Sequence, residues 1–340
     1  TDAWANVVRR LRGLRLLSEG EAPEVMRMHR VVQEVVQGRM GTGRADTLRE
    51  RSLAHAQTRA EEIADTWTDR EARWELAPLL RTAEAALEAE HPDGPRLASF
   101  VQNPLWKLSR LQEARALHTR AIAIQEQTAP YSTGLASNYS NLATIERHLG
   151  HLEEARTLMQ QAICIDEATY DDSHPTLAVR YSNLATIEKP LGHLKEARTL
   201  MQQALAIFEQ VLDADHPHLA TIYANLATIE KPLGHLKEAR TLMHQAIRIG
   251  EADYEEDHPQ LAAYYSNLAG VEQALGHLEE ARALMQKALA IFKQVFDADH
   301  PVLARGYADL AGIERDLGHL EEARTLMQQA IAIDEAAYDD

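Results

Sequence analysis

Histidine is the residue type in this sequence whose spacing most invites a chemical interpretation. Five histidines follow a glycine at intervals of 42 residues, at His151, His193, His235, His277 and His319. Four others precede a proline at the same interval, at His174, His216, His258 and His300. Imidazole is the commonest metal ligand, but a metal ion needs all its ligands in one coordination sphere. Because the members of each series lie a full repeat apart, we interpret both series as structural and predict no metal site.

Other residue types that could support catalysis show no matching arrangement. Cys164 has no paired base nearby in sequence, and its place in an apolar stripe predicts a small core residue. No pair of carboxylates stands apart from the charged surface of each repeat, and the chain has no G-x-x-x-x-G-K-[ST] loop. Five periodic methionines are predicted to be core residues: Met159, Met201, Met243, Met285 and Met327. The chain is therefore predicted not to be an enzyme and to hold no cofactor itself.

Two series of polar side chains are better candidates for binding. Asparagines recur at Asn141, Asn183, Asn225 and Asn267, off the apolar stripe of their helices. Their amides can hydrogen-bond an extended peptide backbone, and equally the neighbouring helix. A basic series stands at Arg147, Lys189, Lys231 and Arg315, with Gln273 interrupting it. In an acidic chain these cations indicate either a groove for an acidic segment or solvated helix ends, and both alternatives stay open.

The elements that position these residues form a repeat of 42 residues. The phrase NLATIE-x-x-LGHL-x-EAR-x-LM-x-x-A returns with few changes, starting at Asn141, Asn183, Asn225, Asn267 and Asp309. In one unit, Pro175 suits the first turn of a helix, and Gly192 suits the left-handed position that ends it. A second amphipathic helix follows from Leu194. A fixed period of this length predicts a helical solenoid in which each unit packs against its neighbours, with no sheet beyond residue 44.

Each first helix also carries a glutamate on or beside its apolar stripe, and we predict an ion pair for it. A buried, unpaired carboxylate is costly or shifts its pKa. Antiparallel packing within one repeat places an arginine ten residues later on the same face. The predicted pairs are Glu146–Arg156, Glu188–Arg198, Glu230–Arg240, Glu272–Arg282 and Glu314–Arg324. Pro190 and Pro232 are expected to kink or end the first helices in which they fall.

The repeat resembles the tetratricopeptide repeat, in the 42-residue form of kinesin light chains. The resemblance rests on Leu184, Ala185, Gly192, Ala197 and Ala204, which recur at the same offsets in five units over residues 132–340. A degenerate unit precedes them at residues 96–131, and the last unit ends part-way, so we expect the array to continue. The resemblance implies an all-α, right-handed superhelix (an α-solenoid) whose first helices line a concave groove for a protein or peptide. Both polar series would lie in that groove.

The first part of the chain follows a different pattern. Two short runs, Leu14–Leu17 and Glu24–Met28, are expected to form a hairpin that leads into a helix over residues 29–37. The segment MRMHRVVQEVV resembles the end of the nucleotide-binding region of NB-ARC proteins, the STAND-class signalling ATPases, with Arg30 in place of the family's aspartate. This implies the end of a winged-helix-like region at 1–43, a helical connector at 44–95, and a longer parent protein in which His29 senses ADP or ATP.

Composition narrows the functional classes. Acidic residues outnumber basic ones by 52 to 35, which gives a formal charge of −17. Nucleic acid and anionic membranes attract positive faces, so neither is an expected partner. The single cysteine fits a reducing compartment, the cytoplasm, and no apolar run is long enough to span a bilayer.

The leading hypothesis is a sensor or autoinhibitory arm of a STAND signalling protein, which binds a protein or peptide and contacts the upstream nucleotide-binding domain. The alternatives are a constitutive scaffold or adaptor of the kinesin-light-chain type, and a repeat region attached to a catalytic domain. A P-loop upstream in the parent protein would favour the first.

Overall fold

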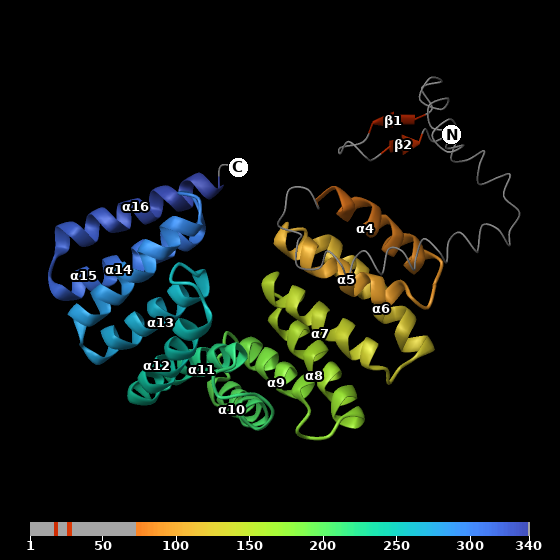
Figure 1. Ribbon diagram of the computed structural model, residues 1–340, viewed down its shortest axis with the longest axis horizontal. Helices are drawn as coiled ribbons and strands as arrows, with labels where there is room; N and C mark the ends of the chain where they lie inside the picture. Colours follow the sequence, from red (N-terminus) through yellow and green to blue (C-terminus); the bar gives the residue numbers. More distant parts are fainter. Residues whose placement is uncertain (1–16, 20–25, 29–72, 339–340) are drawn as a thin grey trace, which may run out of the picture. The chain divides into compact units, whose positions relative to one another are not determined.

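A computed structural model of the chain describes residues 17–19, 26–28 and 73–338. Over residues 73–338 every element is a helix, from α4 (Arg73–Glu88) to α16 (Leu320–Tyr338) (Figure 1). Before them, β1 (Leu17–Glu19) pairs antiparallel with β2 (Met26–Met28). The expected hairpin is therefore present, with its first strand at the point where the prediction placed the strand's end. The expected helix at 29–37, with His29, lies outside the described residues.

The helices form two compact units that divide within α8, between residues 165 and 166. Unit 1 contains α4, α5 (Gly94–Lys107), α6 (Leu111–Thr128), α7 (Thr133–His148) and most of α8 (Leu152–Thr169). Unit 2 continues with α9 (Pro175–Glu188), α10 (Leu194–Val211), α11 (Pro217–Glu230), α12 (Leu236–Asp253), α13 (Pro259–Leu275), α14 (Leu278–Val295), α15 (Pro301–Leu317) and α16. In each repeat the odd-numbered helix from α5 onwards is called helix A, and the even-numbered one helix B. The predicted all-helical solenoid is confirmed.

Every helix A of unit 2 begins in the same way. A histidine with extended backbone precedes the proline, and its Nδ1 accepts a hydrogen bond from the backbone N–H two residues later, at 3.1–3.2 Å. Proline has no N–H to satisfy, so the first turn loses nothing. The capping residues are His174, His216, His258 and His300. This histidine series is therefore structural, as predicted.

The ends of the A helices follow the sequence. α9 and α11 stop at Glu188 and Glu230, two residues before Pro190 and Pro232, whereas α13 and α15 each extend for 17 residues. A proline has no N–H with which to continue the helical hydrogen bonds, so the expected early end is confirmed, while Lys189 and Lys231 before the prolines keep right-handed helical angles. A glycine with φ between 83° and 89° then turns the chain into helix B, at Gly150, Gly192, Gly234, Gly276 and Gly318.

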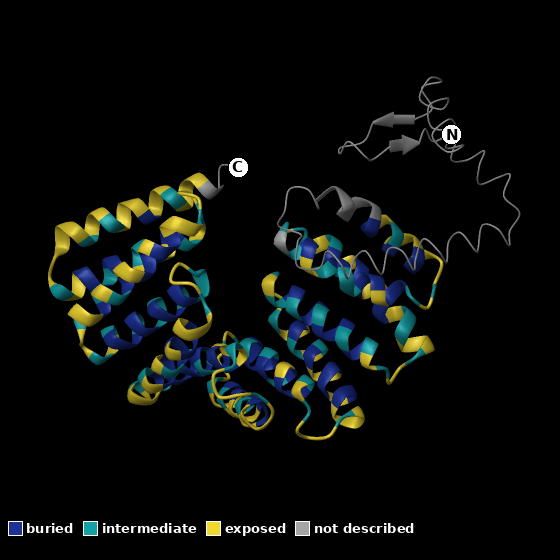
Figure 2. Cartoon of the chain, viewed as in Figure 1, coloured by how far each residue is buried: buried dark blue, intermediate teal, exposed yellow. Residues whose placement is uncertain are grey.

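The core of each unit runs between its A and B layers (Figure 2). Alanines such as Ala185 and Ala197 are fully buried and let the helices approach closely, and four of the five periodic methionines are buried as predicted. Met327 is 42% exposed, because α16 packs mainly against α15. Cys164 is exposed, which corrects its prediction as a core residue. It lies roughly 200° around α8 from the buried Ala162, since each residue turns a helix by about 100°.

One buried contact in unit 1 is polar where the other repeats are apolar. His118 on α6 takes the place of the buried methionines and is fully buried. Its Nδ1 lies 2.7 Å from the side-chain oxygen of Asn138, and within residues 73–338 its Nε2 has no hydrogen-bond partner. Burial lowers the pKa of His118 from 6.5 to about 4. The imidazole is therefore neutral at pH 7.

We expect His118→Met to make unit 1 more resistant to acid. The unfolded chain takes up a proton on His118 below about pH 6.5, whereas the native state does so only near pH 4. The stability contributed by the neutral imidazole is therefore complete above pH 6.5. It is lost as the pH falls toward 4, by about 3 kcal/mol in all. Trp106 lies on α5 of unit 1, and the sequence has no tryptophan beyond residue 165, so urea unfolding followed by tryptophan fluorescence reports on unit 1. Parallel stability curves for the two proteins between pH 7 and 4.5 would contradict this account.

Candidate functional site

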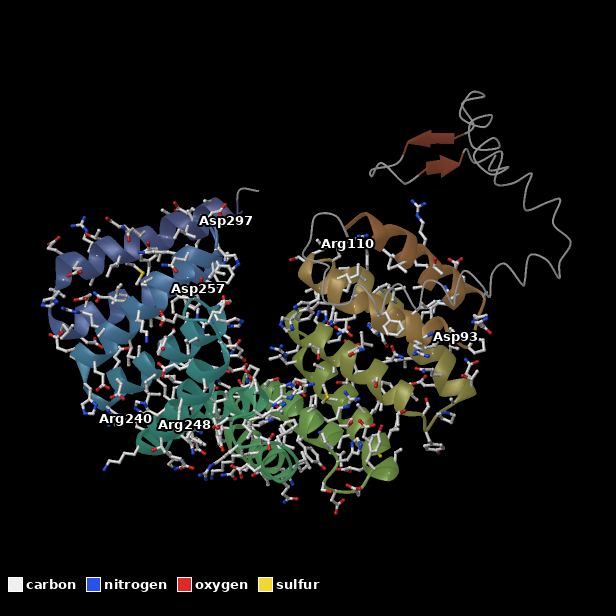
Figure 3. The ribbon with its side chains drawn as sticks, viewed as in Figure 1. Asp93, Arg110, Arg240, Arg248, Asp257 and Asp297 are labelled. Carbon is white, nitrogen blue, oxygen red and sulfur yellow. The ribbon has the colours of Figure 1, made fainter. Side chains whose placement is uncertain are left out.

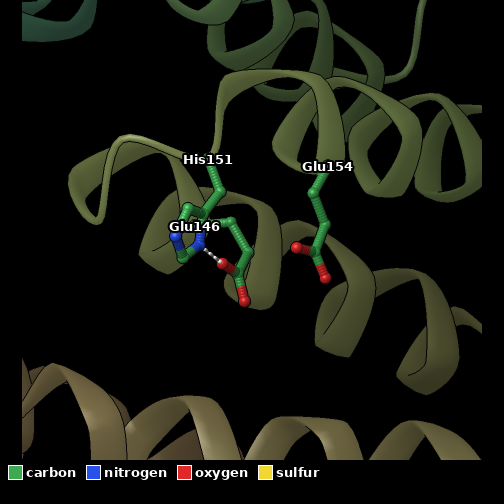
Figure 4. Close-up of side chains that lie close together, drawn as sticks. All are labelled: Glu146, His151 and Glu154. Carbon is green, nitrogen blue, oxygen red and sulfur yellow. Dashed lines mark hydrogen bonds and ion pairs between the residues drawn. The ribbon is translucent and has the colours of Figure 1, made fainter.

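Each turn from helix A to helix B, from α7–α8 onwards, holds a buried glutamate that is bound by the histidine of the same turn. The glutamates are at most 1% exposed, and a histidine Nδ1 five residues later lies 2.6–2.7 Å from their Oε2. Figure 4 shows this bond between Glu146 and His151, with Glu154 from α8 close by. The histidines that follow the glycines therefore bind carboxylates within their own repeats.

For four of the five glutamates, an arginine partner comes from the preceding repeat. The Nε atoms of Arg198 and Arg240 lie 2.5 Å from Oε1 of Glu230 and Glu272. In unit 1, Arg115 binds Glu146 in the same way. Arg282 approaches Glu314, at 3.8 Å. The predicted pairs within one repeat, ten residues apart, are thus wrong. Helix A packs against the helix B before it as well as its own, and these carboxylates meet the earlier helix.

These arginines also reach a second carboxylate at the start of the next helix B. The terminal nitrogens of Arg198 and Arg240 lie 3.4 Å from Glu238 and Glu280. Arg240, labelled in Figure 3, therefore bridges an exposed and a buried carboxylate. The hydrogen bond to the buried glutamate raises the pKa of both guanidinium groups. With Arg115, which lies near Glu146 and Glu154, three such bridges link neighbouring repeats.

We expect Glu230→Ala to destabilise unit 2 by about 1–3 kcal/mol, because Arg198 and His235 both lose their buried acceptor. The matched control is Glu238→Ala, which removes the exposed carboxylate from the same arginine. It should change the stability by at most about 0.5 kcal/mol. Chemical unfolding followed by far-UV circular dichroism measures both variants. Equal effects would mean that burial of the glutamate is not what matters.

The asparagine series lies half-buried on the A helices: Asn141 on α7, Asn183 on α9, Asn225 on α11 and Asn267 on α13. Within residues 73–338 none of the four side-chain amides hydrogen-bonds another residue. The helices hold these amides by their backbones alone, and their donors and acceptors are left for water or a ligand.

Part of the basic series converges on a cavity of about 270 Å³ in the A layer of unit 2. Lys189 and Lys231 enter it from the ends of α9 and α11, and Arg305 enters from α15. Lys189 donates a hydrogen bond to the hydroxyl of Thr228 at 2.9 Å. Lys231 meets Gly270 instead, where a Cβ would lie 2.7 Å from the ammonium nitrogen. The glycine leaves room for this ammonium group.

The remaining members of the series lie elsewhere. Arg147 is half-buried in unit 1, and burial lowers the pKa of its guanidinium group. Arg315 is exposed and forms an ion pair with Asp316 at 2.8 Å. The interrupting Gln273 donates to the other oxygen of the same aspartate. The structure therefore brings together two of the four predicted cations, with Asn267 beside them.

The cavity is electropositive within an acidic chain. Burial, together with repulsion from Arg305 and Lys231, lowers the pKa of Lys189. Asp309 is the one carboxylic acid that lines the cavity, and burial raises its pKa even though the same two cations oppose the shift. Within residues 73–338, Lys231 and Arg305 form no hydrogen bond or ion pair. Such a site favours an anionic group from outside.

Sequence reasoning missed Arg305 and Asp309. Arg305 stands where the two preceding repeats have Ala263 and Thr221, and Asp309 takes the fifth position of the asparagine series. Both belong also to a second cavity of about 310 Å³, whose wall is apolar at Phe292, Phe296 and Val302. The signal that could have found them is departure from the repeat, since a structural position would keep its residue.

We expect the double substitution Asn183→Ala and Asn225→Ala to leave the free energy of unfolding within about 0.5 kcal/mol of the original, since no internal hydrogen bond is lost. It should nevertheless weaken partner binding. The control is Asn138→Ala, because Asn138 is buried and bonded to His118 and Gln125. That change should cost about 1–3 kcal/mol. Urea unfolding with binding assays tests the contrast, and a large loss of stability in the double variant would contradict it.

Comparison with known proteins agrees with the helical repeat. The family described as tetratricopeptide repeat matches residues 105–168, 175–252, 219–294 and 260–336. No curated protein matches the chain. Over residues 73–338, no helix has the length and apolar character that crossing a bilayer requires.

Several solved structures are similar. A putative kinesin light chain from Podospora anserina, with nearly identical TPR-like repeats, is 27% identical, with a TM-score of 0.51 over 61% of this chain and 98% of that one. BtubC (BKLC) from P. vanneervenii is 22% identical, with a TM-score of 0.56 over 67% and 92%. The apo form of RapI is 13% identical, with a TM-score of 0.66 over 85% and 99%. The last two likenesses concern the fold alone.

Proposed function

Because the chain belongs to the tetratricopeptide repeat family, we propose that it is a protein-interaction scaffold rather than an enzyme. In this proposal the A layer of unit 2 binds an extended, acidic segment of a partner protein. The observation that carries it is the cavity in which Lys231 and Arg305 form no hydrogen bond or ion pair within residues 73–338.

The charges around the cavity explain the preference for a carboxylate. Three cations and one aspartic acid line it, and burial with mutual repulsion already lowers the pKa of Lys189. A bound carboxylate relieves this repulsion and forms charge-assisted hydrogen bonds. The chain as a whole has a formal charge of −17. An acidic segment is therefore attracted to this cavity and repelled by the acidic surfaces elsewhere on the chain. The same total argues against nucleic acid or an anionic membrane as partner.

The asparagine series suits the backbone of such a segment. Asn183, Asn225 and Asn267 recur on successive A helices, half-buried and without internal hydrogen bonds within residues 73–338. A peptide in extended conformation presents N–H and C=O groups that an amide can bind as both donor and acceptor. A carboxylate of the segment, bound in the cavity, would fix its position along the A layer. The asparagine amides would bind its main chain regardless of its side-chain sequence. The proposed setting is the cytoplasm, which fits a chain with one cysteine.

A finer proposal makes the chain a sensor or autoinhibitory arm of an NB-ARC, STAND-type signalling protein. It is supported by the resemblance around His29 and by the β1–β2 hairpin just before it, where the end of a winged helix is expected. The kinesin-light-chain likeness supports a constitutive adaptor instead. The reading frame that encodes the chain separates the two: a P-loop module upstream, with bound ADP in the purified parent, supports the sensor.

We expect Lys231→Glu to weaken binding of acidic peptides by about tenfold or more, the effect of losing one charge-assisted hydrogen bond. The probe is an array of 15-residue peptides with graded Asp and Glu content, followed by fluorescence anisotropy with the best binder. Arg324→Glu is the matched control, because it makes the same charge change at an exposed residue of α16 that does not line the cavity. Equal loss with Arg324→Glu, or binders without acidic residues, would overturn the proposed function.

A further inference from the structure

Each of the five A–B turns brings together three potential metal ligands, two glutamates and a histidine. In every cluster one ligand atom from each residue lies within 4.8 Å of the other two. The clusters are Glu146–His151–Glu154, Glu188–His193–Glu196, Glu230–His235–Glu238, Glu272–His277–Glu280 and Glu314–His319–Glu322. The prediction of no metal site considered histidines from different repeats. It overlooked this grouping within one repeat, in which the histidine follows the first glutamate by five residues and precedes the second by three.

In three of these clusters the place of a cation is taken by the arginine of the preceding repeat. Arg115, Arg198 and Arg240 each lie 2.5 Å from the buried glutamate and 3.4–3.7 Å from the exposed one. Two carboxylates that share one guanidinium group mark the space between them as a position for positive charge. A metal ion would have to displace the arginine from these clusters.

The cluster of the last repeat differs from these three, while in the remaining cluster Glu188 and Glu196 both have other partners. Arg282 lies 3.8 Å from Oε1 of Glu314, and this oxygen is buried without a hydrogen bond within residues 73–338. Oε2 is bound only inside the cluster, by His319 at 2.7 Å. Glu322 forms no ion pair in the described part of the chain. The arginine therefore fills the cation position only loosely, where a fully buried carboxylate points into it.

The sequence explains why this arginine is withdrawn. Three residues before Arg198 and Arg240 stand lysines, Lys195 and Lys237, whereas Glu279 stands three residues before Arg282. Glu153 has the same place before Arg156 and lies 3.8 Å from it. Residues three apart are neighbours on a helix surface, and Arg282 lies 3.6 Å from Glu279. The local glutamate therefore competes with Glu314 for the guanidinium group, and lysine at this place cannot.

We propose that Glu314, His319 and Glu322 form a binding site for a zinc-type divalent cation. One imidazole nitrogen and two carboxylate oxygens suit Zn²⁺, with water as a fourth ligand, whereas Ca²⁺ takes six or more oxygens. Tetrahedral bonds of about 2.0–2.2 Å place ligand atoms roughly 3.3 Å apart. Glu314 and His319 need to separate slightly, and the half-exposed imidazole and exposed Glu322 are free to turn. The ion would displace the proton held between Glu314 and His319.

The test is zinc binding to the full, tag-free chain, measured by isothermal titration and by the thermal unfolding temperature. We expect one equivalent of Zn²⁺ bound above the background of surface histidines, with an increase of roughly 5 °C at saturating ion. His319→Ala removes a ligand and should weaken this binding at least tenfold. His277→Ala should leave it unchanged, because Arg240 occupies the corresponding cluster.

The sharper variant changes no ligand. Glu279→Lys restores the residue found three places before Arg198 and Arg240, so Arg282 should return to Glu314 and close the site. Glu279 is largely exposed, so circular dichroism should show an unchanged fold, while zinc affinity falls at least tenfold. Zinc affinity that survives both Glu279→Lys and His319→Ala would overturn the proposal, and so would an equal loss with His277→Ala. Absence of a zinc-dependent change in the unmodified chain would overturn it as well.

Discussion

The structure depends on a charged side chain placed where charge is costly. From α7 onwards, each helix A carries in its last turn a glutamate that is at most 1% exposed, and such a carboxylate is tolerated only with partners of good geometry. Its own turn supplies a histidine, and in four repeats an arginine of the preceding repeat is also within ion-pair distance. The arginines stay partly exposed, so water screens the pairs and limits their energy. The main effect of the pairs is to fix the position of each helix A end relative to the helix B before it.

Near-identical repeats raise a second problem, the order in which they stack. The contacts between helix B of one repeat and helix A of the next are complementary and differ along the chain. Asp166 binds Arg180 at 2.8 Å, while at the corresponding place in a later repeat Gly250 faces Tyr264. A Cβ on Gly250 would lie 3.2 Å from the tyrosine ring, so a larger residue there would crowd it. Exchanging partners would bury an unpaired charge or leave a cavity, which favours a single order of repeats.

Much of this fold follows from sequence because its determinants are local. The period, the His-Pro starts, the glycines and the early ends before Pro190 and Pro232 depend only on backbone geometry within a few residues. The partner of each glutamate does not. Arginines that precede a glutamate by 32 residues or follow it by ten are equally regular in the sequence. Only the packing of helix A against two neighbours distinguishes them. Only part of the cavity could be predicted, for the same reason. Lys231 belongs to a periodic series of basic residues, whereas Arg305 occurs once and gives no periodic signal.

The structural and the binding residues are consecutive, and this connects stability to function. Lys189 directly follows Glu188, and Lys231 directly follows Glu230. Successive residues on a helix point about 100° apart, so a glutamate fixed between two repeats directs the next side chain out of the core. At Lys189 and Lys231 that direction is the cavity of the A layer. Because the glutamate cannot leave its buried site without losing its partners, the backbone of the lysine beside it is held in place before any ligand arrives. A lysine on a backbone held in this way loses less conformational entropy on binding than one on a mobile loop.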